Sequence, residues 1–532
     1  MNKRFIKKGI VFCMIASLTL GGIIPGQGAY AASTKSTQEK TIKNVIMLIP
    51  DGMSVGASTL ARYMLDEKGD IPLAIDEYVT AMVKTRWANG PITDSAPAGT
   101  ALATGNKSIS GALGVDEDLT PKASLLEAAQ LKGKATGVIA TSEFMHATPA
   151  AYTAHEAKRS NYAAIAEQML YQNLDVMFGT GASKVDKSTL DIIATAESLG
   201  YTIIDDKSEL KATKATKVWG NFTSTIGGSN NLSYDIDRDA ATEPSLADMT
   251  SKAIKILSKD KDGFFLMVEG SKIDWAAHAN DTVGIATDVL AFDDAFKAAV
   301  DFAKKEGNTL VIAVTDHGNS GITIGNTYVS PAYDKDPFSV LTPLKGATKT
   351  AEGAIALLDA TKSTQSKNEA LEAYGIDPAD TTLKAEIDAF MADPTIATLV
   401  KTMNKKAVIG YTTGGHTGED VPLYVCAPST IELPKGVIDN TDVAEYIADA
   451  MGVDLAKTTS KLFIDITEVS TLDSATHEFT IKASSGKIIK VKANQSTAYI
   501  DGKAYSLDGQ VTVYINNHFY IPKTLVNLIS AN

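Results

Sequence analysis

Residues 45–53 read VIMLIPDGM, an apolar run that ends in Pro-Asp-Gly. A short run of apolar, partly β-branched side chains that stops at turn-forming residues is typical of a strand buried on both faces. Four further runs have the same character, at 136–140, 264–268, 309–314 and 422–425. Helical patterns lie between them, for example at 124–131, 161–172 and 283–305. This alternation predicts an α/β fold, with a mostly parallel central sheet and helices on both faces.

The composition is that of a globular protein. Of the 532 residues, 44% are hydrophobic and 21% are charged, which excludes a collagen-like or wholly disordered chain. The formal net charge is -13. Because such a chain repels the phosphate backbone at long range, nucleic acid is not expected as a partner.

Residues 1–31 have the pattern of a removable signal peptide. A basic segment at 1–8 precedes a mostly apolar run at 9–24, and Ala29-Tyr30-Ala31 offers small residues before a cleavage site. The alternative is a membrane anchor, but glycines and Pro25 interrupt a run that is already shorter than the roughly 20 residues of a span. Because no later run is long and apolar enough to span, a secreted, extracellular protein without a transmembrane segment is predicted. Cleavage leaves Cys426 as the one cysteine, so no internal disulfide is expected.

The remainder of the sequence divides into two domains. The larger covers 32–473, and two stretches near 182–248 and 344–406 are interpreted as surface insertions because strand signals are sparse there. From 474 onward the pattern changes to short strands with hairpin signals, such as Asp501-Gly502 and Asn516-Asn517. This tail holds six lysines against three acidic residues, whereas 32–473 holds 40 basic and 60 acidic residues. The reversal of charge marks a small β-rich module at 474–532.

Polar residues follow the predicted strands where each one ends. Asp51 follows the first, Thr148 lies a short loop beyond the second, Glu269 ends the third, and Asp316-His317 follows the fourth. Ligands of open parallel sheets bind outside the carboxyl ends of the strands. We therefore expect these side chains to converge on one crevice.

Two more candidates for metal binding stand nearby in the sequence. Asp274 and His278 are spaced i, i+4, which places both on one face of a helix, and His416 stands in a glycine-rich loop just before the fifth strand. Imidazole with carboxylate is a zinc ligand set, and a single remaining thiol disfavours a structural cysteine site. Each histidine alone is more simply read as a hydrogen-bonded loop residue; together they favour a metal centre.

A harder ion is also expected in the same crevice. Asp51, Thr148 and Glu269 form an all-oxygen set that suits magnesium. Taken alone, Thr148 before Pro149 has a simpler reading as a helix cap.

The candidate nucleophile is Ser95. Residues 93–101 read TDSAPAGTA, and Pro97 with its small neighbours predicts the first turns of a closely packed helix. Ser95 would then lie at the helix N-terminus, where free backbone N–H groups bind phosphate. The alternative is a serine that only caps the helix, a role that does not exclude nucleophilic attack.

Taken together, these motifs resemble those of the alkaline phosphatases. The matching residues run in order from about 44 to 428: Pro50-Asp51-Gly52-Met53, Thr93-Asp94-Ser95-Ala96 with Thr104-Gly105, Ala147-Thr148-Pro149-Ala150, Glu269-Gly270, Asp274 with His278, Thr315-Asp316-His317-Gly318, and Gly415-His416-Thr417. The resemblance implies a phosphatase that hydrolyses phosphate monoesters through a phosphoserine on Ser95. A phosphodiesterase of the same superfamily and a phosphate-capturing or surface-binding protein without turnover are the alternatives.

The resemblance also implies the roles of the site residues. One zinc would be held by Asp274, His278 and His416, and a second by Asp51, Asp316, His317 and the Ser95 oxygen. One magnesium would be held by Asp51, Thr148 and Glu269, with His146 as a ligand either directly or through water. Arg159 would bind the phosphate and Asp94 would orient it. Trp275 stands where relatives have lysine or histidine, which removes a cation near the phosphate. Members of the family are often dimers, so the resemblance also implies a homodimer.

The tail resembles the small copper-amine-oxidase N-terminal-like modules of secreted bacterial proteins. The matching residues are the hairpin at 498–503 and the run YINNHFYIP at 514–522. Its positive charge favours binding to an anionic cell-wall polymer. A role in folding or stability is an equally simple interpretation.

Overall fold

The computed structural model describes residues 42–223, 231–327, 329, 333–474, 476–483 and 486–531. The predicted signal peptide at 1–31 lies outside the described residues. Within these residues, helices with the length and hydropathy needed to cross a bilayer are not found.

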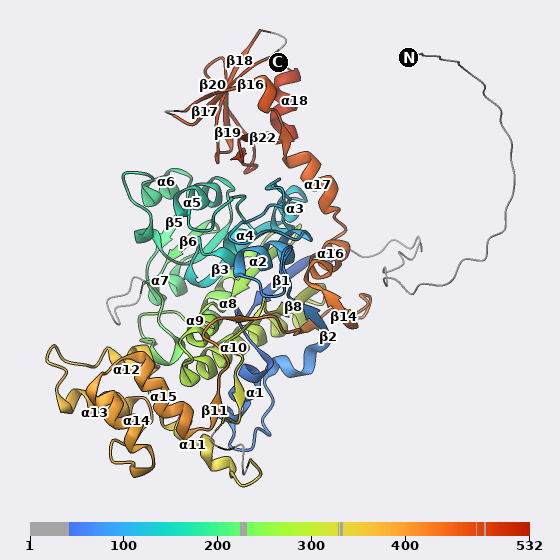
Figure 1. Cartoon of the computed structure of the whole chain (residues 1–532). Coiled ribbons are helices and arrows are strands. Elements are labelled where there is room, and N and C mark those ends of the chain that lie inside the picture. The colour runs from blue at the N-terminus through green and yellow to red at the C-terminus, as the bar shows by residue number, and fades with distance from the viewer. Residues whose placement is uncertain are drawn as a thin grey trace, which may run out of the picture. The chain divides into compact units, whose positions relative to one another are not determined.

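A ten-stranded sheet forms the centre of the fold (Figure 1). Its strands, in spatial order, are β14 (Gly436–Asp439), β2 (Val79–Lys84), β13 (Val421–Cys426), β8 (Thr309–Val314), β1 (Asn44–Ile49), β7 (Phe264–Glu269), β3 (Ala135–Glu143), β4 (Val176–Thr180), β6 (Val218–Asn221) and β5 (Thr202–Ile204). The five apolar runs predicted as strands are all present in it. Neighbouring strands are parallel except at β13, which runs antiparallel to both β2 and β8. The predicted α/β architecture is confirmed.

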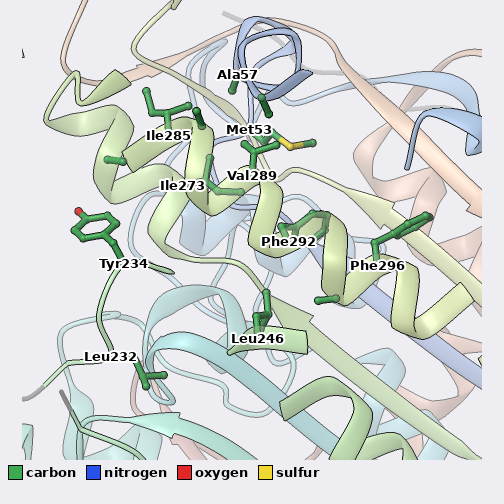
Figure 2. Packing of buried hydrophobic residues seen from close by; sticks show 14 of the residues in the cluster. Met53, Ala57, Leu232, Tyr234, Leu246, Ile273, Ile285, Val289, Phe292 and Phe296 are labelled. Carbon is green, nitrogen blue, oxygen red and sulfur yellow. The ribbon is translucent and has the colours of Figure 1, made fainter. Parts of the chain in front are cut away.

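Helices cover both faces of this sheet, and each face has its own apolar core. Along β1, Ile46 and Leu48 point into one core, while Val45, Met47 and Ile49 point into the other. The first core lies under α1 (Val55–Leu65), α8 (Leu246–Leu257), α9 (Lys272–His278) and α10 (Thr282–Glu306). The second lies under α2 (Ser95–Thr104), α3 (Leu125–Leu131), α4 (Ala147–Ala151), α5 (Tyr162–Tyr171) and α16 (Asn440–Met451). Figure 2 shows α10 contributing Phe292 and Phe296 to the first core, with Met53 and Ile273 nearby.

The two stretches expected as surface insertions differ from one another. Residues 182–248 are expected to be poor in strands, but they supply β5 and β6, which extend one edge of the main sheet. This part of the expectation is wrong. The sequence does not signal these strands because both are short and the outer one is half exposed, so neither gives a long apolar run. The helices of this stretch are α6 (Ile192–Ser198) and α7 (Lys207–Ala212). Residues 344–406 are helical, with α11 (Thr342–Gly346), α12 (Ala351–Ile355), α13 (Thr364–Ala373), α14 (Lys384–Ala392) and α15 (Ile396–Lys406).

The C-terminal segment forms two small sheets, as its hairpin signals predict. One contains β16 (Ser470–Asp473), β17 (Glu478–Lys482), β18 (Ile488–Lys492), β19 (Thr497–Ile500) and β20 (Lys503–Ser506). The other contains β15 (Ile464–Asp465), β22 (His518–Ile521) and β21 (Val513–Ile515), and α17 (Leu455–Leu462) and α18 (Lys523–Ala531) flank this region in the sequence. Both predicted turns have the left-handed backbone of tight hairpins, with φ values of 50° and 82° at Asp501-Gly502 and 51° and 64° at Asn516-Asn517.

Candidate active site

Three buried carboxylates meet where adjacent strands of the main sheet end. Asp51 follows β1, Glu269 is the last residue of β7, and Asp316 lies two residues beyond β8. Because β7, β1 and β8 are adjacent and parallel, their carboxyl ends lie together. All three side chains belong to residues at most 1% exposed. The main sheet therefore gathers three buried carboxyl groups at one point along its carboxyl edge.

His416 reaches the same place by a reversed strand. Since β13 is antiparallel to β8, residues that precede β13 lie at the edge where β8 ends. The short strands β9 (Gly318–Asn319) and β12 (His416–Thr417) pair antiparallel, with His416 opposite Asn319. His416 Nδ1 donates a hydrogen bond of 2.7 Å to the Thr93 carbonyl oxygen. The lone pair of the ring is then on Nε2, on the side of the carboxylates.

Asp274, His278 and His416 form the first ligand cluster. His278 Nδ1 donates to the Gly414 carbonyl oxygen at 2.8 Å, so its lone pair also lies on Nε2 in the neutral ring. The two Nε2 atoms are 3.2 Å apart, and His278 Nε2 is 3.4 Å from Asp274 Oδ2. Two facing lone pairs beside a carboxylate repel one another unless a proton or a cation lies between them. This arrangement fits a metal ion.

His317 is the centre of the second cluster. Its Nε2 lies 3.5 Å from Asp51 Oδ1, 3.2 Å from Asp316 Oδ2 and 3.2 Å from Ser95 Oγ. Its Nδ1 lies 3.2 Å from the Gly318 carbonyl oxygen. The His317 and His416 rings stack with centroids 3.6 Å apart, which places the first and second clusters side by side.

The third cluster lies on the opposite side of Asp51. A ring nitrogen of His146 and carboxylate oxygens of Asp51 and Glu269 all lie within 4.8 Å of one another. Thr148 Oγ1 donates to Asp51 Oδ2 at 3.4 Å, and both His146 and Thr148 come from the start of α4. Asp51 is therefore shared between the second and third clusters.

Burial and mutual repulsion change the protonation of the acidic residues. Burial, followed by the charges of Asp316, Asp274 and Glu269, raises the pKa of Asp51 well above its usual range. Burial raises the pKa of Glu269 to about 8, and burial with the charge of Asp274 raises the pKa of Asp316 to about 6. Asp274 behaves differently: burial alone would raise its pKa, but the hydrogen bond from His278 and the charges of nearby histidines hold it well below its usual range.

The histidines respond to the same environment. Burial lowers the pKa of His317 to about 4, and burial with the charge of Arg159 lowers the pKa of His146 to about 3. Both rings are therefore neutral at physiological pH and keep a lone pair for a ligand bond. The hydrogen bond to Asp274 raises the pKa of His278 to about 8.

Several ligand-type atoms in these clusters have no hydrogen-bond partner among the described residues. They are Asp51 Oδ1, His146 Nδ1, Glu269 Oε1 and Asp316 Oδ2. A buried polar atom without a partner costs about 1–3 kcal/mol, and more when it is charged. Bound cations would satisfy the three carboxylate oxygens, and also His146 Nδ1 when the ring proton is on Nε2, so the residues present fit metal ions on chemical grounds.

Ser95 is the first residue of α2, and Asp94 rather than Ser95 caps the helix. Asp94 Oδ1 accepts a hydrogen bond from the Ala96 N–H at 2.7 Å. The simpler reading of Ser95 as the N-cap is therefore wrong, and its hydroxyl is directed to His317 instead. Arg159 Nη1 donates to the same Asp94 oxygen at 3.3 Å, which holds the guanidinium beside the start of α2. Ser95, Asp94 and Arg159 are thus brought together.

Sequence reasoning missed two positioning residues, Asn319 and Glu419. Asn319 Nδ2 donates to Asp274 Oδ1 at 2.6 Å, and Glu419 accepts hydrogen bonds from Ser54 Oγ at 2.8 Å and Thr417 Oγ1 at 2.7 Å. The Glu419 contacts tie the His416 loop to the segment after β1, and the Asn319 contact holds Asp274 against the segment after β8. The only signal for Asn319 is its place two residues after His317, and the sequence offers no signal for Glu419.

Trp275 packs against the third cluster. Its ring centroid lies 6.1 Å from that of His146, nearly perpendicular to it, and Lys272 Nζ lies 3.8 Å from the centroid of the indole. Trp275 therefore confines the His146 ring on one side.

Comparisons with known proteins agree with this geometry. The family model described as alkaline phosphatase matches residues 42–453. Alkaline phosphatase 3 of Bacillus subtilis is 38% identical, over 84% of this chain and 98% of its own. The cold-active alkaline phosphatase of Shewanella sp. is 29% identical, with a TM-score of 0.68 over 77% of this chain and 99% of its own. A TAB5 alkaline phosphatase variant solved with Mg bound in the M3 site is 27% identical, with a TM-score of 0.54 over 78% of this chain and all of its own.

Proposed function

We infer the activity of this protein from its relatives: the chain belongs to the alkaline phosphatase family and is an alkaline phosphatase, an enzyme that hydrolyses phosphate monoesters. We propose in addition that it acts through a phosphoserine on Ser95 at a site with two zinc ions and one magnesium ion. The contact that carries this proposal is Ser95 Oγ within 3.2 Å of His317 Nε2, beside two buried carboxylates.

The proposed metal ligands follow the three clusters. One zinc would be held by Asp274, His278 and His416, and the other by Asp51, Asp316, His317 and the Ser95 oxygen. The magnesium would be held by Asp51, His146, Thr148 and Glu269. When bound, these ions supply positive charge that lowers the pKa of nearby oxygens and stabilises the attacking and leaving oxygens of an in-line displacement.

Ser95 carries the phosphoryl group in two displacement steps, and Arg159, positioned by Asp94, holds the phosphate. The Ser95 oxygen attacks phosphorus as the bond from phosphorus to the substrate oxygen breaks, and the proton lost by the Ser95 hydroxyl passes through solvent to the departing oxygen, which leaves as an alcohol. The phosphoryl group is then carried by Ser95. Arg159 holds two nonbridging oxygens of the phosphate, and Asp94 fixes the guanidinium in position. Water then attacks the phosphorus of the phosphoserine from the opposite side, the Ser95 oxygen leaves and takes up the proton lost by the water, and inorganic phosphate is released.

Trapping of the phosphoserine tests the nucleophile. A radiolabelled phosphate monoester is mixed with the metal-loaded protein at acidic pH, quenched, and mapped by peptide mass. We expect label on the peptide with Ser95 and none in Ser95→Ala. Label on another residue, or full turnover in Ser95→Ala, would refute the proposal.

Chelation tests the metals, and a second substrate tests the class. Exhaustive chelation is expected to abolish turnover, and re-added zinc with magnesium is expected to restore it more fully than either ion alone. A phosphate diester is expected to react far more slowly than a monoester, because a diester offers Arg159 fewer charged oxygens. A faster diester reaction would favour the phosphodiesterase alternative.

We also propose that the protein is secreted, with removal of residues 1–31. The support is the order of basic, apolar and small residues at the N-terminus. When the full chain is expressed in a bacterial host, the culture medium is expected to contain a protein whose N-terminal residue is Ala32. Retention of uncleaved chain in the membrane fraction would contradict the proposal.

A further proposal concerns the C-terminal sheet, for which we suggest binding to an anionic cell-wall polymer. Along β17 and β18, residues alternate between buried and exposed, and the exposed face carries Lys482, Lys490 and Lys492. Tyr499 of β19 lies on the same face, opposite Lys490, and is 45% exposed. Asp473 and Glu478 lie on the same face, and Glu478 accepts a hydrogen bond from Lys490 at 2.7 Å. The three lysines still exceed the two carboxylates, so the face has a small positive charge, while the formal charge of the whole chain is -13.

Charge reversal tests this without disturbing the core of the module. The triple variant Lys482→Glu, Lys490→Glu, Lys492→Glu is expected to sediment less with purified cell walls than the parent protein. Lys187→Glu, at a strongly exposed lysine in the loop after β4, serves as the control. Equal sedimentation of all three proteins would refute the idea and leave a role in folding.

A further inference from the structure

The two ring nitrogens of His146 have different surroundings. Nε2 lies 3.0 Å from Arg159 Nη2, and Nδ1 is buried without a partner among the described residues. A guanidinium has only N–H donors and no acceptor. The contact with Arg159 therefore requires that Nε2 be the acceptor, which assigns the ring proton to Nδ1.

A neutral imidazole has only one lone pair in the plane of its ring. In the present arrangement the Arg159 contact uses that lone pair. If a third-site cation binds Nε2, it replaces Arg159 directly; if it binds Nδ1, the proton must move to Nε2, which then faces Arg159 as a second donor. A cation-bound water that donates a hydrogen bond to His146 also needs the lone pair of the ring. The conclusion therefore holds for direct and for water-mediated binding.

We propose that occupancy of the third site and the hydrogen bond from Arg159 to His146 exclude one another, so that the third-site cation releases Arg159 Nη2 for phosphate. The inference rests on the proposed function, because it takes the cluster of Asp51, His146 and Glu269 as a cation site. It adds a role for His146 that depends on this chain having histidine at the position.

The surroundings of both residues keep this exchange local. Arg159 Nη1 remains bound to Asp94, and the Arg159 backbone N–H donates to the Gly111 carbonyl oxygen at 2.7 Å. The guanidinium therefore stays beside Ser95 when Nη2 is released. Trp275 packs edge to face on His146, which opposes rotation of the imidazole to a position that could serve both partners.

The exclusion predicts reciprocal coupling. Without phosphate, Arg159 competes with the cation for His146, so magnesium binds more weakly than the carboxylates alone would allow. With phosphate, Nη2 has another acceptor and the competition ends. Because coupling between two sites is the same in both directions, magnesium must strengthen phosphate binding by the factor by which phosphate strengthens magnesium binding.

A double-mutant cycle separates this exclusion from simple charge repulsion. Magnesium affinity is measured by calorimetry, without phosphate or substrate, for zinc-loaded, magnesium-depleted forms of the parent protein, Arg159→Ala, His146→Gln and the double variant. The side-chain carbonyl oxygen of the glutamine in His146→Gln has two lone pairs and can serve a cation and Arg159 together. Arg159→Ala removes a positive charge, which strengthens magnesium binding in both backgrounds. It also removes the competition for the His146 lone pair, and this second effect strengthens magnesium binding only where His146 is present.

We expect Arg159→Ala to tighten magnesium binding about tenfold more in the parent background than in the His146→Gln background, the scale of a hydrogen bond to a charged group. An equal effect in both backgrounds would overturn the exclusion while leaving the third site intact. Absence of magnesium binding in the parent protein would instead overturn the third site of the proposed function.

Nitrogen NMR of histidine-labelled protein gives a second readout that does not depend on affinity. The His146 ring is expected to carry its proton on Nδ1 before magnesium is added, and to lose its bond with Arg159 on titration. Should His146→Gln fail to fold, His146→Asn offers the same carbonyl acceptor. A His146 spectrum that is unchanged by saturating magnesium would refute the proposal.

Discussion

Ser95 Oγ lies 3.2 Å from His317 Nε2, although 222 positions of sequence separate the two residues. Ser95 begins α2 on one face of the sheet, and His317 follows β8, whose end is next to that of β1. The contact brings a hydroxyl with little intrinsic reactivity to a point lined by Asp51 and Asp316. Asp51, Asp316, His317 and the Ser95 oxygen would together hold a cation there.

Replacement of Ser95 by alanine therefore removes the attacking atom while keeping most metal ligands. We expect kcat for a phosphate monoester to fall by at least about a thousandfold, the scale seen when a covalent nucleophile is deleted. Zinc content, measured by mass spectrometry of the metals, is expected to fall little, because His317, Asp51 and Asp316 remain. If zinc content falls in proportion to activity, the activity is lost because Ser95 is needed to bind zinc, and the variant then gives no support for Ser95 as the nucleophile.

Gly52 is expected to be needed for the position of Asp274. It has a φ of 71°, and a Cβ added there would lie 2.8 Å from Asp274 Oδ1 and 3.0 Å from its Cα. Gly52→Ala should therefore displace Asp274 and lower zinc affinity. Gly133→Ala is the matched control, since Gly133 has a φ of 76° and its nearest neighbour would be 3.8 Å away. Both variants carry backbone strain of about 1–2 kcal/mol, but only Gly52→Ala should lose zinc on dialysis.

Metal removal is expected to destabilise the protein most at alkaline pH. In the metal-free fold, burial raises the pKa of Glu269 to about 8, whereas an unfolded glutamate titrates near about 4.3. As pH rises between these values, the unfolded state loses its proton first, so the free energy of unfolding of the chelated protein falls. Asp51 and Asp316 are shifted in the same direction.

The measurement is the melting temperature with and without chelator at pH values near 5 and 9. The loss on chelation should be larger at the higher pH, and Glu269→Gln should reduce the pH dependence of the chelated protein. A loss of equal size at both values would show that the carboxylates contribute nothing to it.

A second pH effect is expected away from the active site, at His155 and Glu127. His155 Nε2 lies 3.0 Å from Glu127 Oε1, and both residues are buried. Burial would lower the pKa of His155, but the charge and hydrogen bond of Glu127 outweigh it and raise the pKa above its usual value. A histidine with a raised folded pKa stabilises the fold fully below the unfolded pKa of about 6.5, and this contribution is lost as pH rises through the folded value.

Glu127→Gln is expected to remove this contribution in the metal-loaded protein. The difference in unfolding free energy between the parent and the variant, measured by denaturant titration, should be largest below pH of about 6 and shrink as the pH rises. A difference that grows with pH would contradict the assigned sign.

How far the sequence predicts this structure depends on the range of each interaction. Apolar runs identify the strands at the centre of the sheet, because burial on both faces leaves a continuous signal. The reversed direction of β13 leaves no such signal, since an apolar run reads alike in both orientations. The sequence predicts that His416 precedes a strand. It does not predict that His416 lies beside Thr93 and Asn319, because those contacts form only when β13 runs antiparallel to β8. Contacts such as Arg159 with His146 depend on side-chain rotamers, which the pattern of residues does not encode.

The contact between the C-terminal strands and the main domain predicts a role in stability. Val513 of β21 is fully buried in a cluster that also contains Val115, Leu462 and Phe463. Gln495 Nε2 donates to Glu167 Oε1 at 2.9 Å, and Ser496 Oγ donates to the Tyr171 carbonyl oxygen at 2.7 Å. A buried apolar cluster surrounded by hydrogen bonds is typical of an interface that contributes to the stability of both parts, rather than of a hinge.

Val513→Asp places an unpaired charge in that cluster and is expected to destabilise the whole chain by several kcal/mol. Calorimetry should show one transition for the parent protein and a lower melting temperature for phosphatase activity in the variant. Tyr499→Asp, on the exposed face of β19, is the control and should change neither. If the module melts early in Val513→Asp while activity keeps its original melting temperature, the two parts fold independently. That outcome would refute a role of the module in the stability of the catalytic domain.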